Sequence, residues 1–220
     1  MKYLVLVLVT MIGFSAPAIA AMSSSDIEQA YNRSYASERA GKFSEAAEAL
    51  SPVAKEYPNG YTLNYRLGYL ASASKDAANA LLFYDKAILA APSAVDPRLA
   101  KMSLLLVQGK YALAEQVGYQ ILNVDLGNYL GNLKLTYALR MQQKNDLAEK
   151  VDIRMLALYP TDASFLAEYG ILKYYAGPLE RSAQIFQDLL TLYPGNALAK
   201  DYLALIKKIS ASKEQKVSAH

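Results

Sequence analysis

Few side chains of this chain have the chemistry that catalysis or metal binding needs. Its one histidine, His220, is the last residue, and cysteine is absent, so we expect no Ser/His/Asp set, Cys/His pair or thiolate metal site. Paired carboxylates such as Glu45 and Glu48 stand at helical spacing, which is typical of a solvated helix face. The glycine-rich stretch 127–132 lacks the lysine of a phosphate-binding loop. The sequence therefore predicts no enzyme, no cofactor and no metal site.

The composition is that of one domain with a sizeable hydrophobic core. Of the 220 residues, 53% are hydrophobic and 20% are charged. The formal net charge is only +3, and no block of five or more Lys or Arg residues occurs. Since a nucleic-acid-binding surface normally carries a concentrated positive charge, we expect no nucleic-acid partner.

The first 20 residues have the pattern of a secretory signal peptide. Lys2 precedes an apolar run over residues 3–14, which Pro17 and the small residues 18–20 follow. We predict cleavage after Ala20 and a periplasmic or secreted mature chain. The alternative is an uncleaved anchor, but the run is shorter than the roughly 20 residues that a membrane-spanning helix needs. No other apolar run approaches that length, so the mature chain is expected to have no transmembrane segment.

Stepping along the chain by 34 residues brings similar residues together, which is the sign of an internal repeat. Prolines recur at one position of the repeat, as Pro58, Pro92, Pro160 and Pro194. A small residue stands at another, in the column Ala46, Ala80, Ala114, Ala148 and Ser182. A third column varies in size, with Phe43, Ala77, Tyr111, Asn145 and Leu179. Two helices that cross closely need a small residue at the contact, because a larger one would overpack it.

The repeated pattern resembles the tetratricopeptide repeat (TPR), a helix-turn-helix unit of 34 residues. The family's motifs stand here as "LGYL" (residues 67–70), "GKFSEA" (41–46) and "FQDLLTLYP" (186–194). The resemblance implies an all-α, right-handed solenoid of five helix-turn-helix units with a C-terminal capping helix. We place the units at residues 27–60, 61–94, 95–128, 129–162 and 163–196. The capping helix is expected over 196–209, and residues 210–220 are expected to be a disordered tail.

Four residues depart from the repeat pattern. Pro52 falls inside the second helix of the first unit, where it should kink the helix. Met102 is oversized for a column of small residues in the first helices. Gly118 and Asp152 replace an aromatic residue in the second helices of units three and four. We therefore expect looser packing in these two units.

The resemblance also implies a concave groove lined by the first helix of each unit. Tyrosine suits recognition, because it combines a large flat area with a hydroxyl and few rotatable bonds. The alternative is that these tyrosines only pack between successive first helices. The family's carboxylate clamp for acidic peptide termini is not expected, because tyrosines occupy its positions in the first two units. The candidate groove residues are Tyr31, Tyr35, Tyr65, Tyr69, Leu99, Leu106, Tyr137, Arg140 and Tyr174.

These features predict a non-catalytic periplasmic scaffold or adaptor. Its partner would be a protein or an extended peptide of the cell envelope, bound along the tyrosine-lined groove. An alternative hypothesis is an accessory subunit for export or assembly of an envelope polymer, such as an exopolysaccharide or a pilus, since tyrosine also stacks on sugar rings. A further hypothesis is self-association through apolar ends of the solenoid.

Overall fold

The computed structural model describes residues 21–218, in which helices and turns occur without any strand. The predicted signal peptide and its cleavage site after Ala20 thus lie at or beyond the edge of the described residues. Within residues 21–218, no helix is both long enough and apolar enough to cross a membrane. The helices are α1 (Ser24–Arg39), α2 (Phe43–Glu48), α3 (Ser51–Glu56), α4 (Tyr61–Ala73), α5 (Ala77–Ala90), α6 (Asp96–Val107), α7 (Tyr111–Val124), α8 (Tyr129–Met141), α9 (Asn145–Leu158), α10 (Ala163–Ala176), α11 (Leu179–Leu192) and α12 (Ala197–Ser218).

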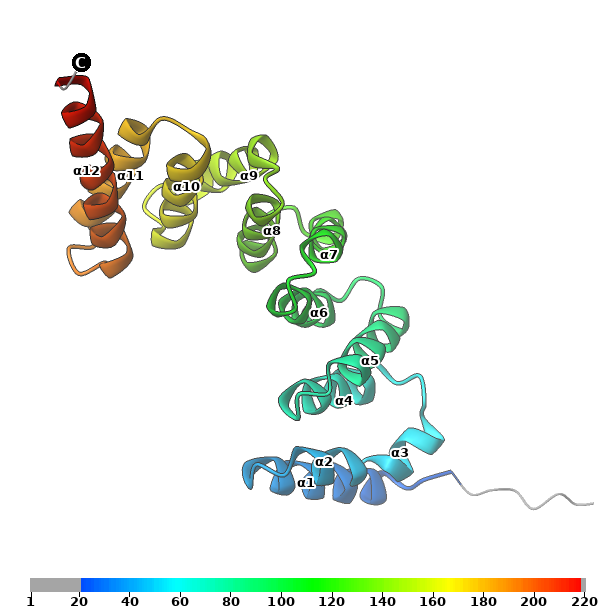
Figure 1. The fold of residues 1–220 in the computed structure, drawn as a ribbon. Helices are drawn as coiled ribbons and strands as arrows, with labels where there is room; N and C mark the ends of the chain where they lie inside the picture. The colour runs from blue at the N-terminus through cyan, green and yellow to red at the C-terminus, as the bar shows by residue number, and fades with distance from the viewer. Residues whose placement is uncertain (1–20, 219–220) are drawn as a thin grey trace, which may run out of the picture.

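The helices pack as successive antiparallel pairs, and each pair contacts mainly the next one along the chain. The first helices of the five units are α1, α4, α6, α8 and α10, and the second helices are α2 with α3, α5, α7, α9 and α11. Figure 1 shows the pairs following one another along a curved path, with α6, α8 and α10 on its inner side. This architecture confirms the all-α solenoid.

A left-handed residue ends the first helix in four of the five units. Gly41 has φ +73° and Gly109 has φ +69°, a conformation that glycine adopts without steric cost. Lys75 and Gln143 take the same conformation, with φ 66° and 60°, so the turn is kept where the glycine is lost. Gly177 in the fifth unit has φ −135° instead. Pro178, the N-cap of α11, follows it, and a proline favours an extended backbone in the residue before it.

The column of small residues lies at the contact between the two helices of each unit. Its five members are fully buried, and the hydroxyl of Ser182 donates a hydrogen bond of 2.9 Å to the carbonyl oxygen of Gly170. The structure thus gives the physical reason for the repeat spacing: each unit has one close helix crossing, and no side chain larger than Ala or Ser stands there.

A second crossing contact pairs residues that are 16 positions apart and complementary in size. A Cβ atom at Gly68 would lie 2.6 Å from the ring of Tyr84, and one at Gly170 would lie 2.7 Å from the ring of Phe186. In unit three the order is reversed: Met102 is the large member, and a Cβ at Gly118 would lie 3.0 Å from its Cε.

The expectation of looser packing at Gly118 is therefore wrong, because Met102 fills the space that an aromatic ring fills elsewhere. Leu135 also closes this site, with its Cδ1 3.1 Å from the Cβ position of Gly118. Asp152, in the equivalent place of unit four, is fully buried opposite Thr136, so that site is closed as well. Both departures are filled by compensating neighbours.

The second helix of the first unit is broken, as Pro52 predicts. It consists of α2 and α3, which are separated at Ala49 and Leu50, and Pro52 stands in the first turn of α3. The ring of Pro52 is exposed while Val53 beside it is buried, so the break does not open the core. Proline is tolerated in a first turn, because the backbone N–H there has no partner within the helix.

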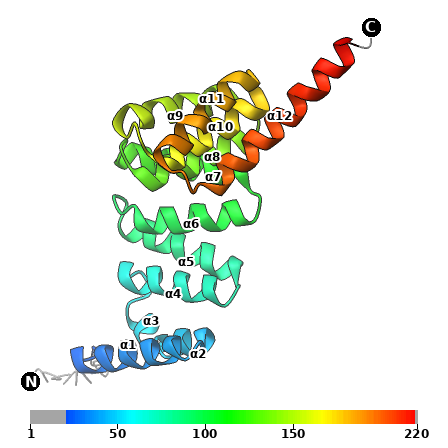
Figure 2. The same ribbon diagram turned by 90° about the vertical axis from the view of Figure 1, so that its left-hand side faces the viewer.

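The C-terminal helix covers the last unit and then continues beyond it. Ala199 and Ile206 of α12 are buried against Phe186 and Leu189 of α11, which confirms the capping helix. The disordered tail from residue 210 is a wrong prediction, since α12 extends to Ser218. No glycine or proline interrupts residues 197–218, and Lys, Glu, Gln and Ala favour helix there. Figure 2 shows this end of α12 projecting away from the solenoid.

Candidate functional site

The first two units bring four of the candidate tyrosines together on α1 and α4. Tyr35 and Tyr69 are 44% and 46% exposed. Tyr31 and Tyr65 are half-buried beside them, and the rings of Tyr31 and Tyr35 have centroids 6.4 Å apart. Tyr31 and Tyr65 pack against neighbouring core residues, whereas Tyr35 and Tyr69 are exposed.

A buried arginine fixes this tyrosine surface. The guanidinium of Arg66 lies 3.7 Å from the ring centroid of Tyr35, in a cation–π contact. Its Nη1 pairs with the Glu38 carboxylate at 2.9 Å, and its Nε and Nη2 donate to the Ser34 hydroxyl at 3.1 and 2.8 Å. The Glu38 carboxylate beside the Tyr69 hydroxyl raises the pKa of that phenol. We call Tyr35, Thr62, Tyr65, Arg66 and Tyr69, which enclose a cavity of about 230 Å³, the tyrosine patch.

Tyr137 and Arg140 form a second, separate cluster further along the groove. The Arg140 guanidinium donates to Glu168 of α10 at 3.0 and 3.4 Å and lies 5.2 Å from the Tyr137 ring centroid. Tyr174 packs edge-on against Tyr202 of α12, with centroids 5.0 Å apart. Arg140 therefore links units four and five, and Tyr174 links unit five to the capping helix.

The two candidate leucines lie between these clusters. Leu99 and Leu106 of α6 are half-buried and pack against the central hydrophobic core. They do not stand on a free surface as the tyrosines of the first two units do. Within residues 21–218, no group of three or more His, Cys, Asp or Glu side chains is placed to hold a metal ion.

Comparisons with known proteins identify the fold. No protein-family model matches the sequence, and no curated protein matches it either. Among solved structures, a tetratricopeptide repeat protein from Parabacteroides merdae ATCC 43184 superposes with a TM-score of 0.78 at 17% identity, over 89% of this chain and 77% of that one. The chain has the TPR fold.

Two further TPR structures align over most of their length. MamA (41-end) from Desulfovibrio magneticus RS-1 has a TM-score of 0.70 and 18% identity, covering 79% of this chain and 98% of that one. YrrB, described as a TPR protein with an unusual peptide-binding site, has a TM-score of 0.69 and 13% identity, covering 81% and 92%. At these identities the likeness establishes the TPR architecture.

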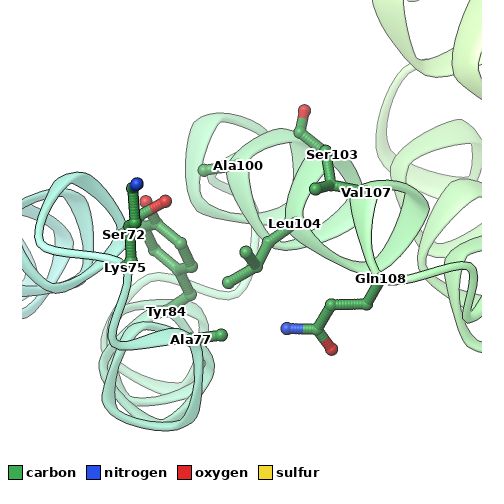
Figure 3. Close-up of a pocket in the computed structure, with 9 residues that line it drawn as sticks. All are labelled: Ser72, Lys75, Ala77, Tyr84, Ala100, Ser103, Leu104, Val107 and Gln108. Atoms are coloured by element: carbon green, nitrogen blue, oxygen red, sulfur yellow. The ribbon is translucent and has the colours of Figure 1, made fainter.

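A larger cavity opens in the TPR solenoid where unit two meets unit three. Its volume is about 500 Å³, and it lies among α4, α5 and α6. We call it the junction cavity, and Figure 3 shows Tyr84 and Ala77 on one side of it and Leu104 and Gln108 on the other. The lining residues are Ser72, Lys75, Ala77, Tyr84, Ala100, Ser103, Leu104, Val107 and Gln108.

Sequence reasoning missed three residues of these sites. Arg66 and Glu38 hold the tyrosine patch, and a charged residue inside an apolar first helix is the signal that points to Arg66. Gln108 borders the junction cavity, with its carbonyl oxygen buried and without a hydrogen-bond partner. No pattern of the sequence singles out Gln108, because the next helices decide what a side chain at the end of α6 meets.

Proposed function

We propose that this chain is a non-catalytic scaffold that binds an extended peptide segment of a partner protein along the inner face of its TPR solenoid. The observation that carries the proposal is the tyrosine patch, in which Tyr35 and Tyr69 stand exposed on helices that Arg66 locks together. Exposed aromatic side chains on a rigid frame bind with little loss of conformational entropy. YrrB, whose description names a peptide-binding site, supports peptide binding by a solenoid of this kind.

The charges of the groove favour a partner segment that is uncharged where it meets the groove. Arg66 is paired with Glu38, and Arg140 is paired with Glu168. Because these charges are already neutralised, neither cluster offers a free cation for an acidic peptide. Tyrosine hydroxyls and rings are left to make the contacts, which suits a segment with apolar side chains and main-chain polar groups.

Replacing Tyr35 and Tyr69 together by alanine is expected to weaken peptide binding roughly 10- to 100-fold, since aromatic residues carry most of the affinity in such surfaces. Peptides for the test are selected from a displayed random library with the chain from residue 21 onward. Their affinities are then measured by fluorescence anisotropy.

Tyr119→Ala is the matched control for this binding test. Tyr119 is 41% exposed but lies on α7, a second helix, so its loss should leave affinity unchanged. Circular dichroism checks that each variant stays folded. Peptides that bind the double alanine variant as tightly as the wild type would contradict the proposal, and so would a library that yields no binding peptide.

The proposed setting is the cell envelope, because residues 1–20 have the pattern of a signal peptide. Chain recovered from the periplasmic or secreted fraction is expected to begin at Ala21 when its N-terminus is sequenced. Ala20→Lys, which removes the small residue before the cleavage position, is expected to leave the leader attached. Recovery of wild-type chain that still begins at Met1 in the cytoplasmic fraction would show that this setting is wrong.

A further inference from the structure

The junction cavity lies where two residues of the repeat are unusually small. In unit three, the residue that opens the second helix contacts the first helix of the next unit, at a position 26 residues later in the chain. At the junction of units three and four these two residues are Tyr111 and Tyr137, whose rings contact edge-on with centroids 6.1 Å apart. At the junction of units two and three they are Ala77 and Ser103, and both line the cavity.

The size of the residue at this position differs between units, and a cavity of about 510 Å³ also opens beside the short Asn145 of unit four. Two other units carry a large apolar side chain there. Phe43 opens α2 and packs against the core that it shares with Leu63 and Leu67 of α4. Leu179 opens α11 and packs against the core that includes Ala199 and Ile206 of α12. Ala77 is too short to make such a contact, so unit two lacks the side chain that would close its junction.

The walls of the junction cavity are suited to an aromatic ring. The ring of Tyr84, which is 3% exposed, faces the space together with Leu104, as Figure 3 shows. Burial raises the pKa of Tyr84 to about 12, and the nearby Ser72 hydroxyl lowers it by less. Tyr84 is thus neutral and presents an uncharged aromatic wall. The charged residue of the lining is Lys75, which is exposed at the rim.

Gln108 stands at the edge of the same space. Figure 3 shows its side-chain nitrogen turned toward the cavity and its Oε1 turned away. Oε1 is buried, so a group inside the cavity does not reach it. The walls that meet an inserted side chain are therefore the apolar and aromatic ones.

From these observations we propose that the junction cavity is the specificity pocket of the groove: it takes one aromatic side chain from the bound segment, in the place of the ring that Tyr111 provides one unit later. The inference rests on the proposed function, because it names the residue type that the bound peptide must contain. The partner is therefore a protein whose extended segment carries an exposed Phe, Tyr or Trp.

A variant that fills the junction cavity from within tests this proposal. Ala77→Tyr places at unit two the residue that unit three already accommodates as Tyr111, so the fold is expected to remain intact. Ala78→Tyr is the matched control, because Ala78 is an exposed neighbour that does not line the cavity. Ser103→Tyr, which copies Tyr137, fills the same space from α6 and serves if Ala77→Tyr does not fold.

The probe is N-acetyl-phenylalaninamide, with N-acetyl-alaninamide as the comparison. In NMR spectra of the chain from residue 21 onward, the phenylalanine probe is expected to shift the methyl signals of Leu104 and Val107. The same shifts are expected in Ala78→Tyr. In Ala77→Tyr or Ser103→Tyr they should require at least tenfold more probe. Equal shifts in filled and unfilled chains, or no shift in the wild type, would overturn the pocket.

Library peptides give a second readout that separates the pocket from the groove. Replacing the aromatic residue of a selected peptide by alanine should weaken binding to the wild type at least tenfold, but should have no further effect with Ala77→Tyr. If Tyr35→Ala/Tyr69→Ala weakens binding while Ala77→Tyr does not, the proposed function holds and the pocket is wrong. If the probe result is positive and no peptide binds, the junction cavity takes an aromatic ring, but the proposed function and the role of the pocket in peptide recognition are both wrong.

Discussion

Asp152→Asn is expected to make the chain more stable at neutral pH and to remove much of the pH dependence of its unfolding. Asp152 is fully buried in α9, and neither carboxylate oxygen has a hydrogen-bond partner. The one proton of the nearby Thr136 hydroxyl is donated to the carbonyl oxygen of Ala148 at 3.4 Å. Burial raises the pKa of Asp152 from 3.8 to about 8.

The sign of the effect follows from which state binds the proton. Between pH 4 and 8 the folded chain keeps Asp152 protonated, whereas the unfolded chain has released the proton. The free energy of unfolding therefore falls as pH rises through this range, by about 1.4 kcal/mol per pH unit. By pH 7 the loss amounts to about 4 kcal/mol relative to a side chain that does not titrate. Asparagine has nearly the same shape but does not titrate, so it carries no cost of binding a proton on folding.

Urea unfolding at several pH values between 5 and 9 measures this difference. Asp146→Asn is the matched control, because Asp146 is an exposed carboxylate on the same helix. The wild type and Asp146→Asn should lose stability in parallel as pH rises, while Asp152→Asn should stay nearly constant. A pH profile of Asp152→Asn that coincides with the wild type would show that Asp152 is not protonated in the folded chain.

Gly118→Phe is expected to destabilise unit three by about 3 kcal/mol, the upper part of the range for overpacked cores. The new side chain would enter space that Met102 and Leu135 already occupy. Met102→Gly alone should also destabilise, because it leaves a cavity beside Gly118. Together the two changes recreate the glycine–aromatic pair of Gly170 and Phe186, so their combined cost should be smaller than the sum by about 1–3 kcal/mol.

A double-mutant cycle on thermal or urea unfolding measures this coupling. Met141→Gly replaces Met102→Gly in the control cycle, since Met141 is 40% exposed on α8 and should be additive with Gly118→Phe. If Met102→Gly and Gly118→Phe are also additive, the size complementarity between the two helices does not determine which residues these positions accept.

The repeat period predicts the architecture well, because the small residues at helix crossings recur at fixed spacing. Ala46 and its equivalents are fully buried, and Pro52 breaks its helix as expected. The sequence alone fails where two positions compensate each other, as Met102 and Gly118 do. Each of these looks like a defect until the helix crossing that joins them is known.

The candidate site is predictable only in part, for a related physical reason. Tyr35 and Tyr69 are exposed on first helices as groove residues should be, and Arg140 bridges two units. Leu99 and Leu106 were assigned to the same face, yet they pack against the core, because a position on a helix face does not say how deeply the neighbouring helices cover it. The end of α12 shows the same limit: composition indicated a disordered tail where the backbone continues as helix.

The open junction between units two and three also bears on the mechanics of the molecule. In a solenoid each unit contacts only its neighbours, so a bending force passes from unit to unit through these contacts alone. The contact of Tyr111 with Tyr137 stiffens the junction of units three and four. Ala77 and Ser103 leave the junction of units two and three without an equivalent contact. Bending of the solenoid should therefore be easier at the junction of units two and three than at the junction of units three and four. An aromatic side chain bound in the junction cavity would fix the angle between units two and three, and thereby the curvature of the whole solenoid.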